Sequence, residues 1–190
     1  MKKPHFYNTQ SRQVEPLNPR QEGHVGLYVC GVTVYNLCHI GHARAYVAFD
    51  VLVRSLRALG YSVKYVRNFT DVDDKIIKAA QDENVEPLDL AQRYIDTFHE
   101  DMRALGCTEA DVEPRVSTHI DAIIAMVETL IERGFAYEVN GDVYYAVRQF
   151  ESYGKLSGRD LDDLRAGARV APGEAKRDPL DFALWKGAKE

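Results

Sequence analysis

The sequence predicts an α/β fold: the first half of a doubly wound parallel sheet, followed by part of an insertion that carries a helix and a β-hairpin. Two observations support this prediction. Residues 27–34, 43–59 and 61–69 read in order as strand, helix and strand, which is the β-α-β unit of a parallel sheet. Further along, Asn140 and Gly141 join two alternating segments, and this dipeptide is the strongest short-range signal for a tight hairpin turn.

The first strand, residues 27–34, is expected to be buried because it is short, apolar and rich in β-branched side chains. Residues 43–59 have apolar side chains at helical spacing and end before Gly60, a residue type that commonly terminates helices. Residues 61–69 alternate as a second strand does. Ligands bind at the carboxyl edge of such a sheet, so the turn over residues 35–41 is the expected place for a site.

Two further helices are expected to cover the sheet. One begins after Thr70, where Asp71, Asp73 and Asp74 lie at a helix amino terminus, the end that favours negative charge. The other spans residues 88–105. Thr70 itself has the residue type of a helix cap. The three aspartates could hold magnesium, but we interpret them as partners of the helix dipole, the commoner role of carboxylates in a first turn.

The chain after Pro114 is predicted to form a second, insertion-like module. Residues 117–133 are an amphipathic helix, and residues 135–139 and 142–147 are the strands of the hairpin. The predicted domains are therefore residues 1–115, half of the sheet domain, and residues 116–190, the module. Residues 151–190 have little periodicity, and the sequence assigns them no role.

Composition and charge exclude several classes of protein. The chain has 190 residues, of which 45% are hydrophobic and 28% charged, as in ordinary globular proteins. No apolar stretch has the length of a membrane span, and residues 1–5 lack the apolar core of a secretory signal, so we expect a cytoplasmic protein without a membrane partner. A formal net charge of -5 excludes a general basic coat for nucleic acid, although a local patch could still bind a polyanion.

The three cysteines do not form a disulfide framework. Cys30, Cys38 and Cys107 are an odd number without framework spacing, which favours reduced thiols. We expect Cys38 and Cys107 to be packing residues. A single cysteine at a strand end, as Cys30 is, is by residue statistics most often a buried apolar group.

The tetrapeptide His39-Ile40-Gly41-His42 lies between the first predicted strand and the first predicted helix. A phosphate placed there would meet unpaired amide groups and the positive end of the helix dipole. Gly41 would let a nucleotide approach the backbone, and the two imidazoles could donate hydrogen bonds to phosphate oxygens. The alternative is a plain helix start with two exposed histidines, and four residues alone do not decide between them.

The residues around this tetrapeptide resemble those of cysteinyl-tRNA synthetases, and the resemblance covers essentially the whole chain. It rests on YVCGVTVYNLCHIGHAR (residues 28–44), RNFTDVDDK (67–75), YGKLS (153–157), GARV (167–170) and DFALWK (181–186). The resemblance implies a Rossmann-like, HUP-type sheet interrupted by a connective insertion. It also implies ATP-dependent activation of cysteine to cysteinyl-adenylate, followed by transfer of the acyl group to tRNA-Cys.

By the same resemblance, His39 and His42 are the catalytic residues, and with Gly41 they bind ATP, a substrate that carries Mg²⁺. Because phosphoryl transfer depends mainly on positioning and charge stabilisation, the imidazoles can act as fixed donors rather than as acids or bases. The expected partners are tRNA-Cys, ATP and L-cysteine.

The resemblance further makes Cys30 one ligand of a Zn²⁺ ion that takes the substrate thiolate. Zinc favours a thiolate, which separates cysteine from serine better than an apolar pocket can. Gly31, Thr33 and Thr70 match positions that line the cysteine pocket. The remaining zinc ligands and the KMSKS loop of the family follow the region matched here, so this chain alone is expected to be inactive or very weak without the missing carboxyl-terminal half.

Two other functions stay open from the sequence. The ligase that joins cysteine to an amino sugar in mycothiol synthesis shares the adenylation site, although residues 33–40 and 153–170 look more like the synthetase. A non-catalytic nucleotide-binding module would keep the fold without turnover. The sequence alone does not separate a fragment from such a module, nor does it give the oligomeric state.

Overall fold

The computed structural model describes residues 3–159, 161 and 176–187. It divides into two compact units, each described here by itself. The first is built on residues 17–120, and the second combines residues 5–16 with the chain after residue 120. None of the helices in the described part is long and apolar enough to cross a membrane. The GARV segment lies outside the described residues.

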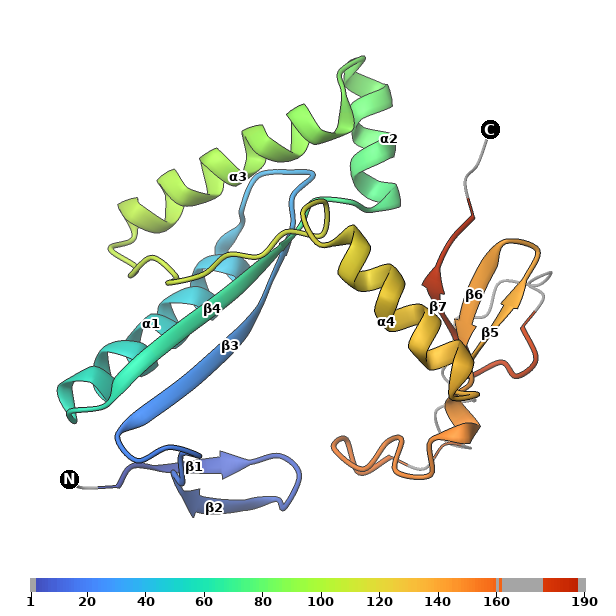
Figure 1. The fold of residues 1–190 in the computed structure, drawn as a ribbon. Helices are drawn as coiled ribbons and strands as arrows, with labels where there is room; N and C mark the ends of the chain where they lie inside the picture. The colour runs from blue at the N-terminus through green and yellow to red at the C-terminus, as the bar shows by residue number, and fades with distance from the viewer. Residues whose placement is uncertain (1–2, 160, 162–175, 188–190) are drawn as a thin grey trace. The chain divides into compact units, whose positions relative to one another are not determined.

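The first unit contains the predicted parallel strand pair. β3 (His24–Thr33) lies parallel to β4 (Ser62–Thr70), and α1 (Ile40–Ala58) connects them, as Figure 1 shows. The strand–helix–strand prediction is therefore confirmed. β3 begins three residues earlier than expected because its first residues alternate between exposed and half-buried positions instead of forming an apolar run.

A third segment lies parallel to β4 on the edge away from β3, and the sequence did not predict it. Isolated bridges pair Val66 with Val112 and Phe69 with Arg115. The amide of Phe69 donates to the carbonyl of Pro114 over 2.9 Å. The segment contains charged residues and a proline, so its sequence does not show the apolar alternation of a strand. A proline has no amide hydrogen to donate, but Pro114 needs only its carbonyl to pair with β4.

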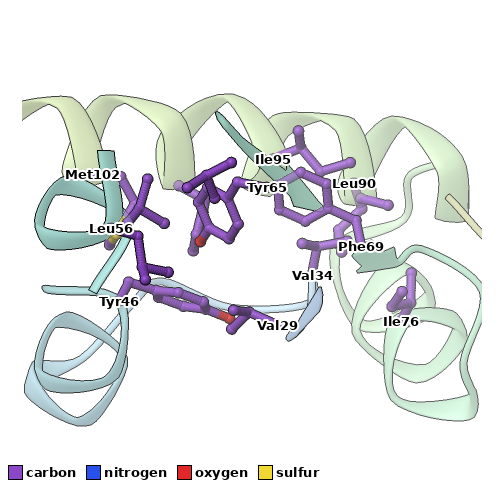
Figure 2. Packing of buried hydrophobic residues seen from close by; sticks show 14 of the residues in the cluster. Val29, Val34, Tyr46, Leu56, Tyr65, Phe69, Ile76, Leu90, Ile95 and Met102 are labelled. Atoms are coloured by element: carbon purple, nitrogen blue, oxygen red, sulfur yellow. The ribbon is translucent and has the colours of Figure 1, made fainter. Parts of the chain in front are cut away.

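The core of the first unit lies on one face of β4. Val63, Tyr65 and Phe69 alternate along the strand and are buried. α3 (Pro87–Ala104) presents Leu90 and Ile95 to this face, and Figure 2 shows them next to Phe69 and Tyr65. The alternation that predicted the strand thus also predicted its buried face.

The helix after Thr70 starts later than the aspartate cluster suggested. α2 (Asp74–Glu83) is capped by Asp73, whose carboxylate accepts from the amide of Lys75 over 2.8 Å. Thr70 is the last residue of β4, so its assignment as a cap was wrong. The helix ends at Asn84, which has a left-handed φ of 54°.

The second unit holds the predicted hairpin. β5 (Ala136–Val139) and β6 (Asp142–Tyr145) are antiparallel, and Asn140 and Gly141 between them have positive φ angles of 54° and 83°, as a type I′ turn requires. α4 (Ile120–Glu132) precedes the hairpin and packs Val127 against Ala136 and Val143.

Two features of this unit were not expected, a third strand beside the hairpin and a second hairpin near the amino terminus. β7 (Phe182–Trp185) adds to β6, giving the order β5-β6-β7, and a short 3-10 helix, η1 (Val147–Gln149), follows β6. β1 (His5–Asn8) and β2 (Gln13–Pro16) form a separate antiparallel hairpin. Both hairpin strands are mostly exposed and only four residues long, so they carry no clear apolar periodicity.

Candidate active site

A cavity of about 380 Å³ lies within the first unit, where β3 ends and α1 begins. This is the carboxyl edge of the parallel pair, the location expected for a ligand. Six of the seven residues singled out from the sequence line it: Cys30, Gly31, Thr33, His39, Gly41 and His42. The seventh, Thr70, is not among the lining residues, but it pairs with Thr33 in the strand register.

The two histidines form the amino-terminal cap of α1. His39 is the capping residue, and its Nδ1 accepts a hydrogen bond from the amide of Gly41 over 3.1 Å. In return, Nδ1 of His42 accepts from the amide of His39, also over 3.1 Å. The ring centroids are 4.0 Å apart. This is the reciprocal arrangement of a capping box, made with imidazoles in place of hydroxyl and carboxylate groups.

The cap defines the tautomer of both rings. Backbone amides can only donate, so each Nδ1 that accepts must lack a proton, and the neutral ring then carries its hydrogen on Nε2. Partial burial, and next the neighbouring His39, hold the pKa of His42 below its usual range, which favours this neutral form. His39 and His42 therefore each offer one Nε2–H donor at the cavity wall.

The expectation of unpaired amides at this helix end was wrong for three of them. The amides of His39 and Gly41 are bound by the imidazoles, and the amide of His42 donates to the carbonyl of His39 over 2.9 Å. The positive end of the helix dipole remains. An anion here would meet the Nε2–H donors of the imidazoles, since the amides of His39, Gly41 and His42 already have partners.

Cys30 and Gly31 lie in a bulge of β3. The strand register runs from Val29 opposite Arg67 to Val32 opposite Phe69, so two residues of β3 face the single residue Asn68 of β4. Cys30 is exposed.

Gly31 is required by close packing of the two backbones. A Cβ atom at this position would lie 1.5 Å from the carbonyl oxygen of Asn68, so any side chain would force β3 and β4 apart. Glycine is therefore the residue that allows the bulge to stay against β4.

Sequence reasoning did not single out several residues that line the cavity, among them Lys75 and Tyr46. Lys75, at the start of α2, lines it, and its ammonium lies 5.4 Å from the ring centroid of Tyr35. Tyr46 on α1 lines it as well. Lys75 ends one of the segments quoted for the resemblance, which was an available signal, whereas the helical position of Tyr46 looked like ordinary core.

The aspartates after β4 do not act as one group. Asp71 is buried, and its carboxylate accepts hydrogen bonds from both the amide and the hydroxyl of Ser117. It therefore ties the chain after α3 to the end of β4, and the interpretation of Asp71 as a helix-dipole partner was wrong. Asp73 caps α2, and Asp74 is its first residue.

Among the described residues, no group of three or more histidine, cysteine or acidic side chains could hold a metal ion. Cys30 is an exposed thiol at the cavity and has the donor chemistry that zinc prefers. Among the described residues, Cys30 could thus supply one ligand of a zinc site, and the other ligands would have to come from elsewhere. The other two cysteines, Cys38 and Cys107, pack against the core as predicted, and burial raises the pKa of both thiols.

Comparison with known proteins gives a consistent result. The family model described as tRNA synthetases class I (C) catalytic domain matches residues 16–190. The chain is 60% identical to the cysteine–tRNA ligase of Oleidesulfovibrio alaskensis over 97% of its own length and 38% of the relative's. It is 64% identical to the cysteine–tRNA ligase of Anaeromyxobacter sp. strain K, over 95% of this chain and 37% of the relative's length. The chloroplastic/mitochondrial enzyme of Arabidopsis thaliana is 55% identical over 97% and 33%.

Solved structures of class I enzymes share the fold. LeuRS of Agrobacterium radiobacter K84, in a ternary complex with tRNA and LeuAMS, matches 70% of this chain and 18% of its own, with a TM-score of 0.56 and 25% identity. Methionyl-tRNA synthetase of Mycobacterium tuberculosis, in complex with methionyl-adenylate, matches 65% of this chain and 25% of its own, with a TM-score of 0.55 and 27% identity. The chain spans less than two-fifths of the length of the cysteine–tRNA ligases above.

Proposed function

The chain belongs to the class I tRNA synthetase family whose catalytic-domain model matches residues 16–190, and from this we propose that it supplies part of the active site of a cysteine–tRNA ligase. In this proposal the cavity at the end of β3 binds ATP and L-cysteine for formation of cysteinyl-adenylate. The acyl group then passes to tRNA-Cys. The single observation that carries the proposal is the imidazole cap at the wall of this cavity.

The proposed role of the cap is to hold the phosphates of ATP. His39 and His42 each offer an Nε2–H donor, and the positive end of the α1 dipole adds to the attraction for anions. Fixed donors of this kind stabilise charge that develops on a phosphoryl group without taking or giving a proton. Lys75 adds a positive charge at the same cavity for the substrate carboxylate or the Mg²⁺-bound phosphates.

The proposed cysteine pocket is the bulge of β3 with the strand ends beside it. Cys30 would hold a zinc ion together with ligands from outside this chain, and that ion, when bound, selects a thiolate substrate. Gly31 keeps the backbone close to β4. Thr33 and Thr70 lie opposite one another at the ends of the two strands and offer hydroxyl groups to the amino acid.

One solved relative supports the proposed adenylate chemistry. The methionyl enzyme of Mycobacterium tuberculosis was solved with methionyl-adenylate. The names of the curated relatives support cysteine as the amino acid and tRNA as the acceptor, in bacteria and in a plant. We extend these properties to the protein that contains this chain.

A hybrid ligase tests the proposal. Residues 1–190 would replace the matching segment of the 60% identical Oleidesulfovibrio alaskensis ligase, whose remaining chain supplies what this one lacks. We expect cysteine-dependent exchange of pyrophosphate into ATP and acylation of tRNA-Cys. Acylation of an amino sugar without acylation of tRNA would instead assign the chain to the ligase of mycothiol synthesis. A folded hybrid that shows no pyrophosphate exchange would favour a non-catalytic nucleotide-binding module.

Two single histidine variants of the hybrid test the role of the helix cap. His42→Ala in the hybrid is expected to lower the exchange rate at least tenfold and to leave the KM for cysteine nearly unchanged, because its donor acts on phosphate. His5→Ala is the matched control, since His5 is exposed in β1 and does not line the cavity. Equal rates for the two variants would contradict the phosphate role.

A further inference from the structure

We propose, on the basis of the function proposed above, that Asn68 and Tyr46 are positioning residues that clamp the Cys30–Gly31 peptide and thereby aim the Cys30 thiol into the cysteine pocket. The polar atoms of this peptide are the carbonyl oxygen of Cys30 and the amide hydrogen of Gly31. Each is bound by a different side chain from a different element. Neither side chain was singled out by the sequence.

The amide side of the clamp is made by Asn68 on β4. Because the bulge places Cys30 and Gly31 opposite one residue, the regular ladder cannot serve both of them. The Oδ1 atom of Asn68 accepts a hydrogen bond from the Gly31 amide over 2.8 Å. The side chain therefore replaces the backbone partner that the bulge removes.

The acceptor of this bond is itself held in place. The hydroxyl of Tyr28 donates to the same Oδ1 atom over 2.8 Å. Two donors converge on one oxygen, which assigns the amide orientation of Asn68, since its NH₂ group could accept neither. Asn68 is half-buried, so its side chain has few alternative partners in solvent.

The carbonyl side of the clamp is made by Tyr46 on α1. Its hydroxyl donates to the carbonyl oxygen of Cys30 over 3.3 Å. Figure 2 shows the ring extending along the core toward Val29, the residue before Cys30.

The Tyr46 ring is fixed from two sides. It packs edge to face on Phe98 of α3 with ring centroids 5.2 Å apart. The guanidinium of Arg67 lies 5.2 Å from its centroid. Because the ring is buried in the core of the first unit, its hydroxyl is a stationary donor.

The consequence is a fixed orientation for an otherwise adaptable residue. Cys30 is exposed and lies in a bulge, where the strand ladder does not define its conformation. With both polar atoms of the following peptide bound, β4 and α1 fix the position of the Cys30 Cα, from which the thiol extends. Partners that orient a metal ligand in this way typically contribute about 10–100-fold to metal affinity or activity.

The test uses matched variants in the hybrid ligase. Asn68→Ala removes the acceptor, whereas Asn68→Asp keeps an oxygen acceptor of the same shape. Tyr46→Phe removes the hydroxyl and keeps the ring. Tyr7→Phe is the control, since Tyr7 is exposed in β1 and does not line the cavity.

We expect Asn68→Ala and Tyr46→Phe to raise the KM for cysteine about 10–100-fold while the KM for ATP changes less than threefold. Asn68→Asp should recover most of the cysteine affinity, and Tyr7→Phe should resemble the wild type. Equal rises of both KM values, or unchanged cysteine KM in Asn68→Ala and Tyr46→Phe, would overturn the clamp. Absence of exchange in the wild-type hybrid would instead overturn the proposed function.

A second measurement does not depend on activity. Hydrogen exchange followed by NMR on the 190-residue chain should show protection of the Gly31 amide, lost in Asn68→Ala and kept in Asn68→Asp. The Phe69 amide, which donates to Pro114, is the internal control and should stay protected in all variants. An unprotected Gly31 amide in the wild-type chain would contradict the clamp even if the Asn68 variants lost activity.

Discussion

At the scale of single residues, His39 and His42 combine an observed structural role, the helix cap, with the chemical role proposed above. Their Nδ1 atoms replace the side-chain oxygens of an ordinary capping box, and this leaves Nε2 for a ligand. The two tasks share one requirement, the neutral ring. A protonated ring would carry a hydrogen on Nδ1 and would lose its hydrogen bond to the backbone amide.

The cap therefore makes stability depend on pH. The pKa of His42 is lowered in the folded protein, so its native state binds fewer protons than its unfolded state, and stability is lost as pH falls below the unfolded value of 6.5 toward the lower folded pKa. His42→Gln keeps an acceptor suited to this position and does not titrate. Urea unfolding at pH 8 and pH 5 should show a smaller acid loss for His42→Gln, and equal losses would contradict the assignment.

Cys30 offers a second prediction at this scale. In the hybrid ligase, Cys30→Ser should lower zinc content per chain and cysteine-dependent exchange together, each about tenfold or more, because serine lacks the thiolate that we propose binds the metal. Metal analysis and the exchange assay measure the two effects. Cys107→Ser is the control, since Cys107 packs against the core away from the cavity. Full zinc content in Cys30→Ser would remove Cys30 from the ligand set.

At the scale of elements, an ion pair in the core attaches the segment after α3 to β4. Arg67 is 2% exposed and pairs with Glu113, whose other oxygen lies 2.7 Å from Nε2 of His99. The guanidinium also lies 4.5 Å from the ring centroid of Phe98. Its Nε is the one buried side-chain polar atom without a partner among the described residues. The pair therefore defines where the third parallel segment lies more than it adds net stability.

This interpretation predicts an asymmetry between variants. Glu113→Leu leaves Arg67 charged and buried without its partner and should lower the free energy of unfolding by about 3–5 kcal/mol. The double variant Arg67→Met with Glu113→Leu removes both charges and should recover most of that loss. Urea unfolding followed by circular dichroism measures both. A double variant as unstable as Glu113→Leu would show that the charges themselves hold the segment.

At the scale of the whole molecule, each unit has its own core and its own spectroscopic reporter. Trp185, the single tryptophan of the sequence, lies in β7 of the second unit. The three cysteines all belong to the first unit. Because Cys30 is exposed in the folded chain, the reactivity of Cys38 and Cys107, which pack against the core, follows the first unit, and tryptophan fluorescence follows the second.

A buried carboxylate in the second unit provides the corresponding prediction. Asp181 accepts from the hydroxyl of Tyr137 over 2.6 Å and from the amides of Val147 and Asp178 over 3.0 and 3.1 Å. In Asp181→Asn, the NH₂ group that replaces one oxygen must face the amide of either Val147 or Asp178, which should cost about 1–3 kcal/mol. The fluorescence midpoint in urea should fall while thiol protection in the first unit stays unchanged. Glu138→Gln, exposed on β5, is the control; a parallel loss of thiol protection would mean that the units unfold together.

The sequence predicted those features that depend on local periodicity and turn chemistry. Alternation along β4 gave the strand and its buried face, and Asn140-Gly141 gave the hairpin because few residues adopt two successive positive φ angles. The resemblance to a known family then supplied residues such as Cys30, which local statistics would have placed in the core. The insertion module proposed from residue 116 stays a prediction.

By itself, then, the sequence determined the β-α-β unit, the hairpin and the residues at the carboxyl edge of the sheet, because each depends on neighbours in the chain. Only the tertiary structure decided that residues 112–115 lie along β4, that Asp71 binds Ser117, and that Asn68 binds the Gly31 amide. The physical reason is sequence separation. Partners 37 to 46 positions apart leave no periodic trace, and a polar side chain shows its partner only once the backbone has brought the two together.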